Sequence, residues 1–135
     1  MFASFNNDNF PIVNVKLHEG PTNESEYNSF INEWLRLYDD QKDFTFVFDT
    51  TTMINPSYKY ALKMPMFIKR LKKREKQYLQ KSIILINDNK IKYMLDFIFL
   101  VQSPVAPVYI YNINNGVLNT IEDIINNPNT LFIRN

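Results

Sequence analysis

The chain has 135 residues, a formal net charge of +1 at pH 7, 15% aromatic residues, two Gly and no Cys. This length fits one domain with a sizeable core, and the aromatic content lies outside the compositions typical of disordered chains. The lack of Cys excludes disulfide scaffolds, Cys-ligated zinc, iron–sulfur clusters and thiol catalysis, and two Gly are too few for phosphate-binding loops.

The first third of the chain predicts a strand followed by a helix. Residues 10–17 alternate between apolar and polar positions, which predicts a half-buried strand. Such a strand suits the border of a mixed sheet, where it could run antiparallel. Asn23 followed three residues later by Glu26 is typical of a capping box that opens a helix. The apolar stripe of this helix consists of Tyr27, Phe30, Ile31, Trp34 and Tyr38.

The middle of the chain predicts two buried strands separated by a long helix. Residues 44–48 and 82–86 are apolar at nearly every position, so we expect them in the centre of the sheet, residues 44–48 with both faces covered. Residues 57–80 are expected to form a helix that Pro65 kinks or restarts, because proline removes a backbone donor and clashes with the preceding turn. Its buried side is expected to include Leu62, Met66, Ile68, Leu71, Tyr78 and Leu79.

The last third predicts a short, very apolar helix over residues 91–101 and a strand over residues 105–111. Pro107 places that strand at an edge or confines its pairing to the second half. A final helix is expected over residues 120–127, and a final strand over residues 131–133.

This alternation of strands and helices predicts an α/β fold. Right-handed crossovers would return successive strands to a single mixed, mostly parallel sheet of about four to five strands with helices packed on it. No repeat, linker or low-complexity segment divides the chain, so residues 1–135 are expected to form one domain.

The composition also bears on the location of the protein. No stretch reaches the ~18 apolar residues of a membrane span, and the first residues lack the pattern of a secretory signal. Together with the absence of Cys, this favours a cytoplasmic protein. The many Asn, Ile, Lys, Phe and Tyr suggest an AT-rich genome, such as that of a protist, a low-GC bacterium or a large DNA virus.

The sequence carries no familiar catalytic or metal-binding motif. The only His, His18, has neither a nucleophile nor an orienting partner in the sequence, so we interpret it as a surface or capping residue. Asp88 and Asp96 are interpreted as solvated carboxylates rather than metal ligands. We therefore expect a protein that is not an enzyme and that uses no metal or cofactor. An enzyme based on Asp49 or Asp88 is the remaining catalytic alternative.

Basic residues concentrate in one segment. Residues 59–81 contain nine Lys or Arg and one acid, Glu75, so the segment carries +8 (nine minus one) and the rest of the chain −7. A cationic helix of this kind can meet an acidic protein or the anionic headgroups of a membrane; nucleic acid is not expected, because no known nucleic-acid module is present. The alternative is the exposed face of an amphipathic helix, paired with the acidic helix before it. The candidate binding residues are Lys69, Arg70, Lys72, Lys73 and Lys76.

Polar residues follow directly after three of the predicted strands, at positions 49–52, 87–89 and 112–115. If these strands are parallel, the three clusters meet at one edge of the sheet, where open α/β folds bind ligands. The alternative is that Asn, Asp and Thr serve there as turn and cap residues. The candidate residues of this polar rim are Asp49, Thr50, Ser57, Asn87 and Asn112.

Residues 44–125 resemble the STAS domain, the SpoIIAA-like fold of anti-sigma factor antagonists and anion-transporter tails. The matching pieces are the apolar strand that ends in Asp49, the turn before Ser57 and its helix, the apolar strand at 83–86, the strand at 108–111 and the helix at 121–124. In the antagonists, a Ser or Thr at the start of the first of these helices is phosphorylated to switch partner binding, a role that by position would fall to Ser57. The strand–helix order is also similar to that of CRAL-TRIO lipid-binding domains.

Two functions follow as expectations. The STAS resemblance, the missing catalytic motifs and the +8 segment predict a non-enzymatic interaction or regulatory module whose contact surfaces are the cationic helix and the polar rim. The alternative is a CRAL-TRIO-like carrier or sensor of a lipid or other apolar ligand, because residues 91–101 are more apolar than one sheet face requires. The same apolar helix could instead form a homodimer face.

Overall fold

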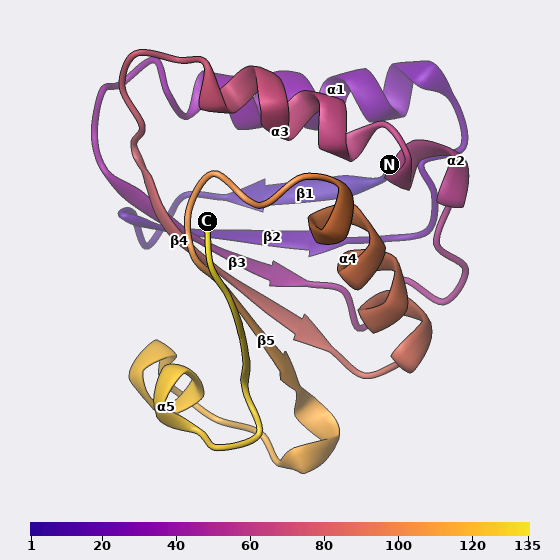
Figure 1. Cartoon of the computed structure of the whole chain (residues 1–135), viewed down its shortest axis with the longest axis vertical. Coiled ribbons are helices and arrows are strands. Elements are labelled where there is room, and N and C mark those ends of the chain that lie inside the picture. Colours follow the sequence, from indigo (N-terminus) through magenta and orange to yellow (C-terminus); the bar gives the residue numbers. More distant parts are fainter.

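The computed structural model of the chain describes residues 1–135 (Figure 1). Its six strands are β1 (Ala3–Asn6), β2 (Ile12–Leu17), β3 (Phe44–Asp49), β4 (Leu79–Ile86), β5 (Val108–Asn112) and β6 (Leu131–Ile133). Its α-helices are α1 (Glu24–Arg36), α2 (Tyr58–Ala61), α3 (Met64–Lys72), α4 (Asn89–Val101) and α5 (Ile121–Asn126), and a 3₁₀ turn (Ile113–Asn115) follows β5. The predicted α/β class is confirmed, with one mixed sheet of six strands rather than four to five.

The strands lie in the sheet in the order in which they follow along the chain, from β1 to β6. Strands β2 to β5 are parallel to one another, whereas β1 and β6 pair antiparallel at the two edges. The strand predicted within residues 10–17 is β2, and it runs parallel to β3, so its antiparallel placement at the border is wrong. That position belongs to β1, whose four residues are too few for a periodic pattern to stand out.

The consecutive strand order places the connecting helices on one face of the sheet. Crossovers between parallel strands are right-handed, and steps that always move in the same direction across the sheet keep every crossover helix on the same side. Accordingly α1, α3 and α4 form one layer over the sheet (Figure 1). Phe46, Ile84 and Ile110 face this layer from three neighbouring strands and join its helices in a core of 24 buried residues.

The opposite face of the sheet is covered only in part. There α5 packs beside β5, and its Ile124 forms a small cluster with Ile83 and Tyr111. Over β3, Thr45 and Val47 are only half-buried on this face. The expectation that both faces of residues 44–48 are covered is therefore wrong, because one short helix covers only the β5 end of this side.

The long helix expected over residues 57–80 is wrong in its extent. Two short helices, α2 and α3, replace it; Pro65 lies in the first turn of α3, so the predicted restart is confirmed. The chain leaves the helix at Lys73, because it must return to the start of the next parallel strand, β4. Leu62 and Met66, expected on the buried side, are 58% and 74% exposed.

Side-chain caps fix where the helices begin. The side chain of Asn23 accepts a hydrogen bond from the backbone N–H of Glu26 (2.9 Å) at the start of α1, and Thr120 accepts one from Asp123 (3.1 Å) at the start of α5. Both predicted starts are confirmed. The capping box is only half formed, because the Glu26 carboxylate accepts its hydrogen bonds from Thr22 instead.

Aromatic rings hold the helices on the sheet. Trp34 of α1 lies between Phe46 of β3 and Phe67 of α3, with ring centroids 4.8 Å and 5.1 Å apart in edge-to-face geometry. Such pairs contribute about 0.5–1.5 kcal/mol each beyond the burial of their surface. The apolar stripe predicted for α1, from Tyr27 to Tyr38, is buried throughout.

Phe46 is fully buried, so Phe46→Ala should lower the free energy of unfolding by about 3–5 kcal/mol, because the burial of the ring is lost and a void remains. Chemical denaturation followed by circular dichroism measures this change. Phe132→Ala is the matched control, since the Phe132 ring on edge strand β6 is 48% exposed, and it should cost less than half as much. Equal losses in the two variants would contradict the placement of the core.

Candidate functional site

An apolar cavity lies between the sheet and the helices that cover it. Its volume is about 140 Å³, and 21 of the 27 residues that bound it are hydrophobic. Strands β2 to β5 form its floor, and α1 to α4 form its walls and roof. Phe2, the loops after β2 and β3 and the segment between α4 and β5 complete it. The helical side chains around it include Tyr27, Trp34, Tyr60, Met64, Met94 and Leu95.

The apolar side chains around the cavity lack packing partners on the side that faces the open space. Two small buried residues, Ala61 and Ala106, stand at its wall, where a longer side chain would occupy part of the space. A molecule that filled the cavity would restore the missing contacts.

The wall of the cavity is uncharged. No Lys, Arg, His, Asp or Glu bounds it, and the Thr50 hydroxyl at its edge donates to the carbonyl of Leu85 (2.8 Å). Burial raises the pKa of the Tyr27 hydroxyl, which therefore stays neutral at physiological pH, and it lies 3.8 Å from the Met64 sulfur. A charged ligand group would find no partner there, so the interior suits an uncharged, apolar molecule.

One buried polar atom of a wall residue has no hydrogen-bond partner, Nε1 of Trp34. Burial raises the pKa of Tyr38, two residues after the end of α1, to about 12, and the neighbouring Trp34 N–H and Arg74 guanidinium oppose that rise. The Tyr38 hydroxyl itself donates to Gln77 (3.0 Å).

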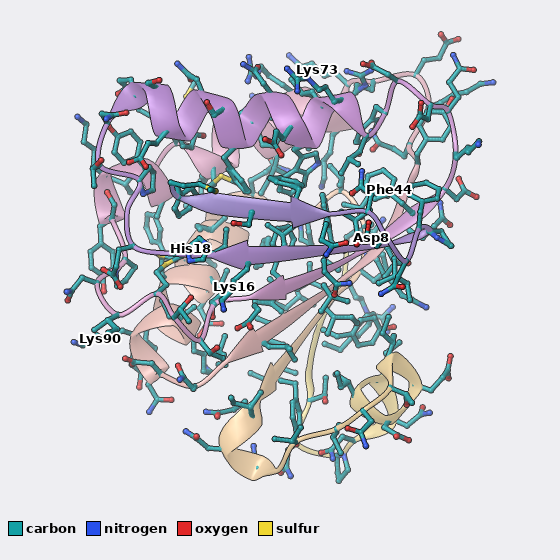
Figure 2. The ribbon with its side chains drawn as sticks, turned by 180° about the vertical axis from the view of Figure 1, so that it is seen from behind. Asp8, Lys16, His18, Phe44, Lys73 and Lys90 are labelled. Carbon is teal, nitrogen blue, oxygen red and sulfur yellow. The ribbon has the colours of Figure 1, made fainter.

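The predicted cationic residues end α3 and continue into the loop before β4. We call this set the cationic segment; it consists of Lys69, Arg70, Lys72, Lys73, Arg74 and Lys76. All six side chains are exposed, and Figure 2 shows Lys73 at the outer edge of the molecule. The predicted place of Lys76 on the helix is wrong, because α3 has ended before it. Positive charge at the end of α3 is favourable toward the helix dipole.

The cationic segment has no carboxylate partner. The salt bridges of the chain are those between the N-terminal ammonium and Glu26 (3.1 Å), Lys63 and Glu24 (2.7 Å), and Lys92 and Asp96 (2.9 Å). Pairing with the acidic helix α1 therefore occurs at Lys63 and not within the cationic segment. Lys72 donates a hydrogen bond to the Ser103 hydroxyl (2.5 Å), which leaves its charge unneutralised.

The structure brings the loops of the predicted polar rim together. Strands β3, β4 and β5 are parallel neighbours, so their carboxyl ends lie at one edge of the sheet. The Asn87 side chain donates to the carbonyl of Thr51 (3.3 Å), and the Asn114 side chain donates to the carbonyl of Asn87 (3.2 Å). The predicted convergence of the three loops is confirmed.

The rim residues mostly serve the backbone around them. Asp49 and Asn112 each accept a hydrogen bond from the backbone N–H two residues later (2.9 Å in both), which is the turn and cap role that Asn and Asp commonly have. The strand order does not reverse at this edge, so it offers no switch point of the kind that binds ligands in doubly wound sheets. Thr50 and Ser57 border the apolar cavity instead.

Nε2 of His18, directly after β2, lies 3.0 Å from the hydroxyl oxygen of Ser4 near the start of β1, and Figure 2 shows His18 at the end of β2. Sequence patterns miss this pair, because the two residues are 14 positions apart and β1 is not predicted. A catalytic Ser–His pair needs a third group that orients the imidazole. No carboxylate hydrogen-bonds to His18, so we describe the pair as a contact between two strands.

Most cavity residues have no distinguishing signal in the sequence. Their apolar periodicity is that of any buried strand or helix, and it does not separate a filled core from a hollow one. The sequence assigns Thr50 and Ser57 to the rim rather than to the cavity. The only usable hint is the small size of Ala61 and Ala106 at positions that turn out to be buried.

No group of three or more His, Asp or Glu side chains is placed to hold a metal ion. None of the helices combines the length and the apolarity that crossing a bilayer requires. Comparisons with models of known protein families, with curated proteins and with solved structures found no match to this chain. Its function is therefore inferred from the geometry of the site itself.

The half-buried carboxylate of Glu26 helps to place a wall of the cavity. Glu26 binds the Thr22 hydroxyl and N–H and the N-terminal ammonium next to Phe2, and these contacts lower its pKa from the ordinary 4.5 to about 2. Because the pKa in the folded chain lies below that in the unfolded chain, ionised Glu26 stabilises the fold above about pH 4.5. That contribution is lost as the pH falls toward 2.

Glu26→Gln should be less stable than the wild type at pH 6, and the difference should shrink as the pH falls toward 2, because the wild-type carboxyl then takes up a proton. Urea denaturation at a series of pH values measures this. Glu33→Gln, at an exposed position of α1 without a salt bridge, is the control and should show no such dependence. A Glu26→Gln variant as stable as the wild type at pH 6 would contradict the assignment.

Proposed function

We propose that this protein binds a small, uncharged, apolar molecule in the cavity beneath its helices, as a carrier or sensor rather than as an enzyme. The observation that carries the proposal is the hollow of about 140 Å³ inside an otherwise aromatic core, with no charged residue at its wall. An engineered cavity of about 150 Å³ lined by Leu, Ile and Phe stays dry and binds benzene or xenon. Burial of the ligand's apolar surface would supply the affinity.

The volume limits what the cavity can enclose. The buried part of the ligand is about as large as one aromatic ring or the end of an alkyl chain. Met53, Met64 and Met94 bound the space, and the unbranched, polarizable Met side chain adapts to irregular shapes. A longer apolar chain could thus be accepted if these side chains move and its polar end stays outside.

This proposal takes up the carrier or sensor alternative that the similarity to CRAL-TRIO domains suggests; that similarity and the resemblance to STAS domains stay predictions. The geometry favours the cavity over the polar rim as a ligand site, because the rim groups are engaged in hydrogen bonds with the backbone around them. Ser57 lies at the edge of the cavity, before α2, and a regulatory role for it stays a prediction.

Benzene is a suitable probe ligand for the cavity, and the NMR signals of the methionine methyl groups can report its binding. Met53, Met64 and Met94 border the cavity, whereas Met1 and Met66 are 83% and 74% exposed. Titration with benzene should shift the ¹³C-methyl NMR signals of the first three in a saturable way and leave the last two unchanged. Shifts of all five signals, or of none, would contradict the proposal.

A filled cavity should no longer bind. Ala61→Leu places a larger side chain at the wall and reduces the space for the ligand. It should weaken benzene binding at least about tenfold, because losing the burial of one or two methylene-sized groups changes the affinity by about that factor. Val117→Leu is the matched control, since it enlarges an apolar side chain that is 80% exposed and remote from the cavity. Equal affinity of the two variants would place the binding site elsewhere.

The natural ligand can be sought separately. Native mass spectrometry of protein purified from cells would detect a bound molecule by its mass.

A further inference from the structure

We infer that the outer surface of α2, α3 and α4 docks on a lipid bilayer that contains anionic lipids. The inference rests on two sets of exposed side chains, one apolar and one basic, that the fold places on the same layer. It does not require that the cavity be occupied.

The outer surface of the helical layer exposes large apolar side chains. Tyr93, Phe97 and Leu100 follow each other at spacings of four and three, so they lie along one side of α4. Leu62 caps the end of α2, and Met66 lies in the first turn of α3. We call these residues the apolar ridge, which consists of Leu62, Met66, Tyr93, Phe97, Leu100 and Val101. Leu100 is 86% exposed, more than any other large apolar residue of the chain.

The two helices that carry most of the ridge lie next to each other. Lys72 near the end of α3 hydrogen-bonds to Ser103 just after α4, and Ile68 of α3 packs with Ile98 of α4 in one buried cluster. Both helices cover the same face of the sheet (Figure 1). Their exposed sides therefore adjoin where the two helices touch, on the outside of the helical layer.

Basic side chains flank the apolar ridge. The cationic segment follows the ridge at the end of α3, and Lys90 lies in the first turn of α4; Figure 2 shows Lys73 and Lys90 at the periphery of the molecule, far apart. The acid on the outer side of α4, Asp96, is paired with Lys92. Exposed apolar side chains with unpaired cations at their borders are typical of surfaces that lie in the headgroup region of an anionic membrane.

The chemistry of this surface fits a bilayer better than a folded acidic partner. Its cations have no carboxylate partners, and Lys72 is the one that makes a side-chain hydrogen bond. Arg70 and Arg74 lie over the rings of Phe67 and Tyr38, which leaves their charges unneutralised. Its most exposed apolar groups, Leu100 and Met66, are aliphatic and protrude from two helices, which suits insertion among acyl chains. A bilayer is also a reservoir of uncharged apolar molecules of the class proposed for the cavity.

Co-sedimentation of the full chain with vesicles tests the inference. The protein should bind phosphatidylcholine vesicles that contain phosphatidylserine, should not bind vesicles of phosphatidylcholine alone, and should bind less tightly at high salt. No binding to the anionic vesicles would overturn the inference. Retention on immobilised polyglutamate without vesicle binding would overturn it as well and would assign the cations to an acidic protein.

Matched variants separate the cationic segment from net charge. Lys69→Gln, Lys72→Gln and Lys73→Gln together should weaken vesicle binding about 100-fold, at about fivefold for each cation removed near the membrane. The control removes three exposed cations elsewhere, Lys16, Lys42 and Arg134, by the same change to Gln and should lower binding severalfold at most. Equal losses would show that only net charge matters and would overturn the assigned surface.

A second pair tests insertion of the apolar ridge. Leu100→Gln with Val101→Gln should weaken binding about tenfold, whereas Val117→Gln, at a residue equally exposed on another part of the chain, should leave it unchanged. Vesicle binding by the Leu100 and Val101 double variant equal to that of the wild type would contradict insertion of the apolar ridge. Ala61→Leu should bind vesicles as the wild type does, so failure of the cavity proposal and failure of this inference remain distinguishable.

Discussion

The fold depends on one topological constraint, the consecutive order of its parallel strands. Each right-handed crossover steps to the next position in the sheet and never back, so α1, α3 and α4 must share one face. That face then collects nearly all of the apolar burial, while α5 shields only one end of the other. A deep layer on one side gives room for the cavity, and the lack of an order reversal removes the crevice at the strand ends.

Two helices of this layer, α3 and α4, carry apolar side chains on both their inner and their outer sides. The inner side, with residues such as Phe67, Ile91 and Leu95, packs on the sheet and closes the cavity. The outer side, with Met66 and Leu100, is exposed to water, which is unfavourable for apolar side chains, and nothing else in the chain covers it. A helix that is apolar on both sides suits a protein whose outer helical layer contacts the apolar part of a lipid bilayer.

Local sequence signals predict the framework well. Period-2 and continuous apolar runs identify β2 to β5, and Asn23 and Thr120 identify the starts of two helices, because those signals act within a few residues. The residues after Lys73 are misread as helix, since their helix propensity is overridden by the need to reach β4. The three polar loops are predicted to meet because parallel strands end at one edge.

The cavity could not be predicted in the same way. A void is a small difference between the space that the backbone encloses and the volume of the side chains in it, and no single residue carries that difference. The sequence does not reveal the exposure of Leu62 and Met66 either, because it depends on where the helices begin and end. A continuous helix over residues 57–80 would have turned them differently from the two short helices that form.

The walls of the cavity reach from Phe2, before the first strand, to Val108, in the fifth. Residues this far apart along the chain meet only when the sheet has been assembled almost to its last strand. No fragment that ends before β5 encloses the space, so a guest molecule can recognise only the nearly complete fold. Occupancy would then favour the finished native state over every partly folded form, and would couple the abundance of the protein to the supply of its ligand.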